Sequence, residues 1–138
     1  MPAPVHGTIS LTVPADVRLL GVVRRVVESV GELADFSENA IYESVLAVSE
    51  ACANVMRHGY GDAGGLVALE CRVGADGVEF LIRDSGEPFD LASVPELPPD
   101  ELREGGRGVF LIRRLMDEAA SRPLPDGGNE LRMFKAKG

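Results

Sequence analysis

The apolar residues of this chain follow two periods, one of two residues and one of three to four. Residues 8–13 alternate between polar and apolar side chains, which predicts a strand that Pro14 ends. A helical period begins after Asp16, a suitable N-cap, and continues to about Ala34. The apolar stripe of this first predicted helix consists of Leu20, Val23, Val27 and Val30.

A second helical period predicts a helix over residues 38–58. Ser37 is placed to cap its start, and Gly59 suits the left-handed conformation in which many helices end. The residues at spacings of three and four predict one apolar face, formed by Ile41, Val45, Val48, Cys52 and Val55.

The rest of the chain is predicted to form four strands and one more helix. In order these are a strand over Leu66–Val73, its hairpin partner over 78–83, a helix from 109 to about 118, a short strand over 119–123 and a last strand with Leu131, Met133 and Lys135 on one side. A loop with room for a short helical turn connects Asp84 to Glu104. This order predicts an α+β fold in one domain, residues 1–138, with a sheet that carries helices on one face.

Composition and charge narrow the classes of function. The chain has 138 residues, 45% of them hydrophobic, and a net charge of -8, which argues against nucleic acid or an anionic membrane as a partner. No apolar stretch approaches the roughly 20 residues that span a bilayer, and the start of the chain does not resemble a signal peptide. Cys52 and Cys71 lack the spacing of metal ligands, so we expect reduced, buried thiols and a cytoplasmic protein.

A polar line on the second predicted helix carries candidate chemistry. Glu50, Asn54 and His58 recur every four residues and therefore lie along one side. The Asn54 amide oxygen is a suitable Mg²⁺ ligand, and the Glu50 carboxylate one turn away can accept a proton from a nearby hydroxyl. On spacing alone, a solvated helix face is the favoured interpretation.

Three glycine-containing segments add further candidates. Asp84, at the end of a buried strand, can accept a hydrogen bond from an exocyclic amine such as that of adenine, and Gly86 would let a flat ring approach the backbone. Residues 105–108 (Gly-Gly-Arg-Gly) precede a predicted helix and suit an anion. Residues 127–129 place Asn129 where it can help to hold a base. For each segment taken alone, an ordinary turn or hinge is the favoured interpretation.

Together, in this order, the four segments resemble the GHKL ATPase superfamily, which includes gyrase, MutL and the histidine kinases. Residues 50–60 resemble its N box, 84–90 its G1 box, 105–108 its G2 box and 128–133 its last box. The forms Asn-x-x-x-His-Gly-Tyr and Asp-x-Gly-x-Pro-Phe-Asp are most similar to the anti-sigma factor serine kinases of bacteria. The resemblance implies a two-layer α/β sandwich of the Bergerat type, with a mixed, mostly antiparallel sheet.

The resemblance also implies roles for individual residues. Glu50 matches the general base that takes the proton of the attacking serine, and Asn54 matches the Mg²⁺ ligand. Asp84 matches the residue that reads the adenine amine, with Gly86 beneath the ring. Asn129 stands where the family commonly has Thr. The lid end that wraps the ATP phosphates is matched by Gly106, Arg107 and Gly108, with Gly105 and Val109 beside them. Arg57 matches no family role.

The function implied is that of a protein-serine kinase and anti-sigma factor. Such a protein uses ATP and Mg²⁺, binds a sigma factor, phosphorylates a serine on an anti-anti-sigma antagonist, and forms a homodimer through its first strand and first helix. Histidine kinases need a phosphoacceptor histidine on a dimerising hairpin, and the two histidines here are His6 and His58. The alternative is an ATP- or ADP-dependent interaction switch with little kinase activity, which the presence of Glu50 disfavours.

Overall fold

The structure is a computed structural model that describes residues 5–59, 65–85, 104–125 and 127–137, with the backbone alone described at 58–59 and 104–109. Three α-helices and five strands make up this part of the chain. The strands are β1 (Gly7–Pro14), β2 (Leu66–Val73), β3 (Gly77–Asp84), β4 (Glu118–Pro123) and β5 (Asn129–Ala136). The helices are α1 (Leu20–Leu33), α2 (Glu38–Asn54) and α3 (Glu104–Leu115), with short turns η1 (Val17–Leu19) before α1 and η2 (Val55–Gly59) after α2.

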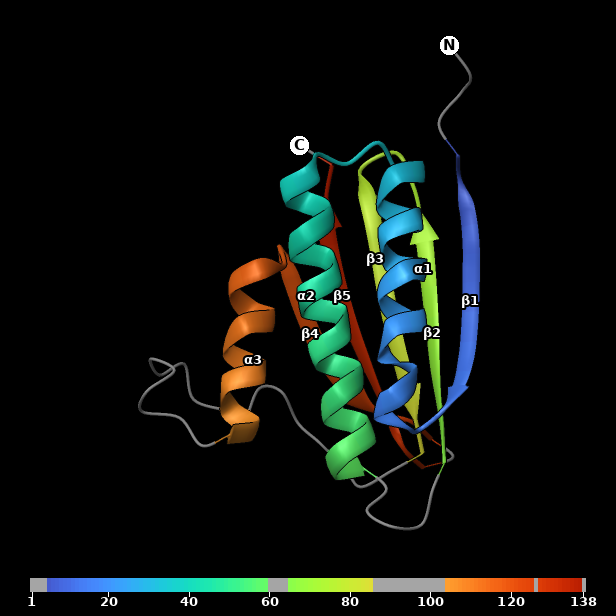
Figure 1. Cartoon of the computed structure of the whole chain (residues 1–138), viewed down its shortest axis with the longest axis vertical. Helices are drawn as coiled ribbons and strands as arrows, with labels where there is room; N and C mark the ends of the chain where they lie inside the picture. Colours follow the sequence, from blue (N-terminus) through green and yellow to red (C-terminus); the bar gives the residue numbers. More distant parts are fainter. Residues whose placement is uncertain (1–4, 60–64, 86–103, 126, 138) are drawn as a thin grey trace.

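The strands form one sheet in the order β1-β2-β3-β5-β4, and the helices cover one of its faces (Figure 1). The predicted α+β, two-layer class is therefore confirmed. Each of the four pairings is antiparallel, so the described sheet is antiparallel throughout rather than mixed as predicted. Strand β5 lies between β3 and β4 because the chain passes through α3 and β4 before it returns to the sheet.

The core lies between the sheet and the helices. All four residues of the apolar stripe predicted for the first helix are buried. From the sheet side, alternate residues of the central strands point at the helices and are almost fully buried: Val67, Leu69, Cys71, Val78, Phe80, Ile82 and Met133. The period-two and period-3.6 patterns thus predicted correctly which faces meet.

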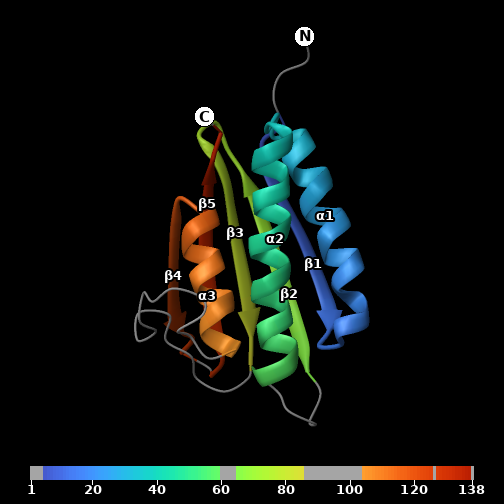
Figure 2. The same ribbon diagram turned by 60° about the vertical axis from the view of Figure 1, so that its left-hand side comes forward.

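Helix α2 departs from its predicted single apolar face. It lies between α1 and α3 and also packs on the sheet, so three of its sides are in contact with other elements (Figure 2). Small residues such as Ser44, Ala47 and Ala51 are buried on its flanks, whereas Ile41 and Val45 of the predicted face remain half-exposed. A helix surrounded on three sides has no simple amphipathic period, because small side chains allow its neighbours to approach.

Several predicted boundaries are corrected. The first helix begins as a 3₁₀ turn that Asp16 caps, and the second ends in a π-helical turn over Val55–Gly59. Helix α3 starts at Glu104 and ends at Leu115, not over 109–118 as predicted. It ends early because Asp117 leaves the helix and joins the sheet, where its N–H donates to the Phe134 carbonyl at 2.9 Å. The short helical turn predicted between Asp84 and Glu104 lies outside the described residues.

The sheet face without helices carries a connected chain of ion pairs. Eight alternating charges cross strands β2 to β4 in the sequence Glu118, Arg132, Glu79, Arg72, Glu70, Arg83, Glu130 and Arg122. Glu130 is 7% exposed and accepts hydrogen bonds from Arg83 Nε at 2.7 Å and from Arg122 Nε at 2.8 Å. These contacts keep the pKa of Glu130 below its ordinary value, first through Arg122 and then through Arg83.

Both cysteines are buried and free of disulfide bonds, as predicted. Burial is the main cause that raises the pKa of the Cys52 and Cys71 thiols to about 12, so both stay protonated at neutral pH. Within the described ranges, none of the helices has the length and apolar character required to cross a membrane.

Candidate active site

Four chain segments that are distant in sequence meet at one end of the molecule. Helix α2 ends there, β3 ends there, α3 begins there and β5 begins there (Figures 1 and 2). These are the four segments that the sequence singled out. The fold therefore brings the candidate residues of the described part to one edge of the two layers.

The polar line of α2 lies on the last turns of the helix, at this end of the molecule. Glu50 and Asn54 lie one turn apart and both are half-buried. Beyond Asn54 the helix widens into the π-helical turn η2, a distortion that is frequent at functional sites. The exposed Arg57 lies on this turn, and its Nη2 is 3.6 Å from Glu50 Oε1. The side chain of His58, the third residue of the predicted line, lies outside the described residues.

The second part of the site joins β3 to β5. Asp84 and Asn129 are direct partners in the antiparallel register, and Asn129 Nδ2 donates to Asp84 Oδ1 at 3.3 Å. Asn129 is 6% exposed. Its amide therefore restrains the carboxylate at the mouth of the core, where one side of the Asp84 carboxylate faces the helical layer.

Gly128 makes the Asp84 arrangement possible. It adopts φ +90°, and a Cβ added there would be 1.9 Å from the Asp84 carbonyl oxygen and 2.7 Å from the Ser85 Cα. Both neighbours are backbone atoms, which cannot rotate away. Position 128 therefore requires glycine for two reasons: the positive φ and the close approach of the two backbones. The sequence placed Gly128 in a turn, and its close contact with Asp84 depends on a strand pairing across 45 residues.

The glycine-rich segment takes a different form from the predicted one. Residues 105–108 fall in the first turns of α3 rather than in a turn that precedes the helix. Because glycine tolerates helical dihedral angles, the helix extends through them. The side chain of Arg107 and the whole of Gly86 lie outside what the structure describes, as does the ring contact proposed for Gly86.

The chemistry available at this end is a set of oxygen donors with distinct surroundings. Two carboxylates, Glu50 and Asp84, and two amides, Asn54 and Asn129, come from α2, β3 and β5. The described residues contain no group of three or more histidine, cysteine, aspartate or glutamate side chains that would hold a metal. An amide oxygen such as that of Asn54 suits Mg²⁺, which takes oxygen ligands and keeps several waters.

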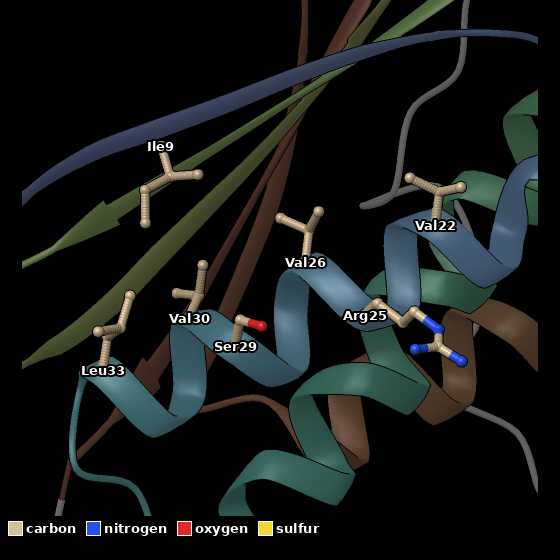
Figure 3. Close-up of a pocket in the computed structure, with 7 residues that line it drawn as sticks. All are labelled: Ile9, Val22, Arg25, Val26, Ser29, Val30 and Leu33. Carbon is tan, nitrogen blue, oxygen red and sulfur yellow. The ribbon is translucent and has the colours of Figure 1, made fainter.

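A shallow apolar groove lies elsewhere, between β1 and α1 (Figure 3). Its volume is about 350 Å³, and Ile9 of β1 faces the α1 side chains across it. The α1 residues that line it are Val22, Arg25, Val26, Ser29, Val30 and Leu33. Since it is built by the first strand and first helix, this groove is separate from the site of α2, β3 and β5.

The fold is that of a histidine kinase-like ATPase domain, and this chain belongs to that family. The family's sequence model, described as "Histidine kinase-like ATPase domain", matches residues 13–135. The match extends from the end of β1 to near the end of β5.

Among individual proteins, the chain is similar to several named serine-protein kinase RsbW. It is 36% identical to that of Halalkalibacterium halodurans over an alignment 136 residues long, which covers 93% of this chain and 82% of the relative. It is 38% identical to that of Oceanobacillus iheyensis, and the match covers 82% of this chain and 77% of the relative. It is 33% identical to that of Bacillus subtilis, and the match covers 80% of this chain and 74% of the relative.

Solved structures share the fold. The RsbU and RsbW domains of Rv1364c from Mycobacterium tuberculosis match with a TM-score of 0.64 at 20% identity, over 94% of this chain and 31% of that one. The histidine kinase domain of a blue-light activated kinase from Erythrobacter litoralis matches with a TM-score of 0.54 at 20% identity, over 91% of this chain and 62% of that one. At these identities the likeness concerns architecture alone.

Proposed function

We propose that this protein is an ATP-dependent protein-serine kinase that acts as an anti-sigma factor. It binds a sigma factor and transfers the ATP γ-phosphoryl group to a serine of an antagonist protein, in the cytoplasm. The observation that supports the proposal is that α2, which carries Glu50 and Asn54, ends at the same end of a histidine kinase-like ATPase fold as the Asp84–Asn129 pair of β3 and β5. The serine-protein kinase names of the relatives support the choice of serine as acceptor.

We assign the adenine end of ATP to Asp84. Its carboxylate accepts a hydrogen bond from the exocyclic amine, and Asn129 holds that carboxylate from the neighbouring strand. Guanine presents an oxygen acceptor at the equivalent position, so the same carboxylate would repel it. We include Gly86 beneath the ring, as the resemblance implies.

We assign the phosphates to the start of α3. The first N–H groups of a helix have no partner within the helix, and the helix dipole favours negative charge there. Glycines 105, 106 and 108 would let phosphate oxygens approach that backbone, with Arg107 and Val109 in the same segment.

Asn54 fits as a ligand of Mg²⁺, because its amide oxygen is a hard donor one turn from Glu50 on the same polar side. When bound, Mg²⁺ would neutralise charge on the phosphates. Glu50 accepts the proton from the serine hydroxyl as the new oxygen–phosphorus bond forms. The bond between the γ-phosphorus and the bridging oxygen breaks, and ADP leaves with that electron pair. Catalysis of this kind rests on positioning and charge more than on covalent chemistry.

The experiment that tests the function is transfer of labelled γ-phosphate from ATP, with Mg²⁺, to candidate antagonist proteins encoded near this one. The proposal expects label on one antagonist, recovered as phosphoserine after hydrolysis. Tight ATP binding without label on any antagonist would favour the interaction switch instead.

We further propose a homodimer formed through β1 and α1. Strand β1 is an edge of the described sheet, and none of its eight residues is charged, although charged residues commonly protect such edges. The neighbouring groove adds exposed apolar surface, with Val22 and Leu33 each 44% exposed. A second copy, which carries the same uncharged edge and groove, is a suitable partner for both under two-fold symmetry.

A further inference from the structure

The contact between Arg57 and Glu50 lies in the candidate site, and the family pattern assigns no role to Arg57. Residues seven apart on a helix lie on the same side, about 10 Å apart along the axis. Long side chains on a helix point back toward its N-terminus. Arg57 lies in η2, and its Nη2 is 3.6 Å from Glu50 Oε1, so the side chain extends back toward the N-terminal side.

The two side chains are both partly accessible, with Glu50 31% and Arg57 45% exposed. An ion pair with that exposure adds roughly 0–1 kcal/mol to stability, so it has little value as a fold contact. At 3.6 Å it is an electrostatic contact without a hydrogen bond. The Glu50 oxygens are therefore held near a cation while they keep lone pairs available to accept a proton.

Arg57 is also the only cation within 4.0 Å of Glu50 among the side chains that the structure describes. Asp84, the other carboxylate of the site, is held from β5 by Asn129. The ion pair that the structure describes for Glu50 comes instead from η2, the turn that directly follows its own helix. A general base acts only within hydrogen-bond reach of the proton that it removes, and a misplacement of 1 Å costs large factors in rate.

We propose that Arg57 is a positioning residue for Glu50, which holds the carboxylate in the orientation that accepts the serine proton. The inference rests on the proposed kinase function. Arg57 acts through the base, and the affinity for ATP does not depend on it. The π-helical turn contributes because it sets the direction from which Arg57 reaches back along α2.

The test measures phosphoryl transfer and ATP affinity for Arg57→Ala, Arg57→Lys and Glu50→Gln, and for the double variant Arg57→Ala with Glu50→Gln. Arg57→Ala is expected to lower kcat about 10- to 100-fold and to leave the Kd for ATP, by calorimetry, within about twofold. Arg57→Lys should recover part of the loss, because a charge remains. In the Glu50→Gln background the same Arg57→Ala change should have no further effect on the residual rate.

Arg114→Ala is the matched control, since Arg114 is an exposed arginine in the last turn of α3, whereas the start of that helix lies at the site (Figure 1). It should leave kcat and Kd unchanged. Wild-type kcat in Arg57→Ala would overturn the inference and leave the kinase function intact. So would an Arg57→Ala loss that persists in the Glu50→Gln background or that appears as weaker ATP binding, because Arg57 would then act on the nucleotide. If the wild type transferred no phosphate, the proposed function would fail and the inference with it.

Discussion

At Gly128 a dihedral angle of +90° and a backbone contact coincide, and this single residue sets how β5 approaches Asp84. Its neighbour Gly127 has a similar φ of +95°, but a Cβ there would meet nothing within 4 Å. Replacing Gly127 would therefore incur only the strain of the dihedral angle, whereas replacing Gly128 would incur both that strain and the backbone clash. They provide a matched pair of variants in one turn.

We predict that Gly128→Ala weakens ATP binding by a factor of ten or more, since the added Cβ forces the Asp84 backbone away from β5. Gly127→Ala should bear only the dihedral strain, about 1–2 kcal/mol of stability, with ATP affinity near that of the wild type. Calorimetry with ATP measures the affinities, and denaturant unfolding measures the strain. Equal ATP affinities in the two variants would contradict the assignment of Asp84 to the adenine.

At the scale of elements, the ion-pair chain joins β2, β3, β5 and β4 across the face that lacks helices. Arg83 and Glu130 are direct partners in the register, immediately next to the Asp84–Asn129 pair, whose side chains point to the opposite face. The same two strands therefore carry the candidate adenine contact on one face and, on the other, an ion pair whose carboxylate is buried and whose arginine is partly exposed. The ion pairs hold β3 against β5 directly beside the Asp84–Asn129 pair, where the candidate site needs the two strands to stay paired.

We predict that Glu130→Gln lowers the free energy of unfolding by about 1–3 kcal/mol at neutral pH, because two charged hydrogen bonds are weakened. Since Arg122 and Arg83 keep the pKa of Glu130 below its ordinary value of 4.5, its contribution is complete above that pH and is lost as the pH falls through the lower folded pKa. The difference between wild type and Glu130→Gln should therefore shrink in acid. Denaturant unfolding across the acidic range measures it.

Glu118→Gln is the matched control, because Glu118 is an exposed end of the same chain and contacts Arg132 at 3.6 Å. It should change stability by a few tenths of a kcal/mol at most. A Glu130 effect that stays constant down to strongly acidic pH would show that the carboxylate is not the source of the stability.

The elements also show which buried faces hydrophobic periodicity can predict. The stripe of α1 and the alternation in β2 and β3 were predicted correctly, because each of these elements packs one face on the core. The burial around α2 was missed, since two helices and a sheet surround it and small residues such as Ala47 and Ala51 then become core. The start of α3 was missed because its glycines read as a turn, although nothing in their chemistry prevents a helix.

For the molecule as a whole, the order of the strands and the contacts within the site depend on pairings between distant segments. The sequence indicated which faces are apolar, but β5 beside β3 joins residues about 50 positions apart, and no local period reports that. The grouping of the four segments was anticipated through the resemblance to a known family. The Arg57–Glu50 contact was not anticipated, because it depends on how far a side chain on the π-helical turn extends back along the helix.

We predict that the protein in solution has the mass of a dimer, twice 14.7 kDa. Replacing Val22 and Val26 together by Glu places charges in the β1–α1 groove and should give the monomer mass by light scattering. Tyr42→Glu is the control, since Tyr42 is 62% exposed on α2, outside the groove, and should leave the mass unchanged. A wild type of 14.7 kDa, or a dimer insensitive to the groove charges, would contradict the proposed interface.

The central claim is that the end of α2 supplies the base for phosphoryl transfer to serine. Glu50→Gln preserves size and removes the proton acceptor, whereas Glu38→Gln, in the first turn of the same helix, makes the same change away from the site. The measurement is transfer of labelled phosphate to the antagonist, with ATP affinity determined in parallel. Glu50→Gln is expected to bind ATP like the wild type and to transfer phosphate at least about 100-fold more slowly, while Glu38→Gln transfers normally. Full transfer by Glu50→Gln would contradict the account.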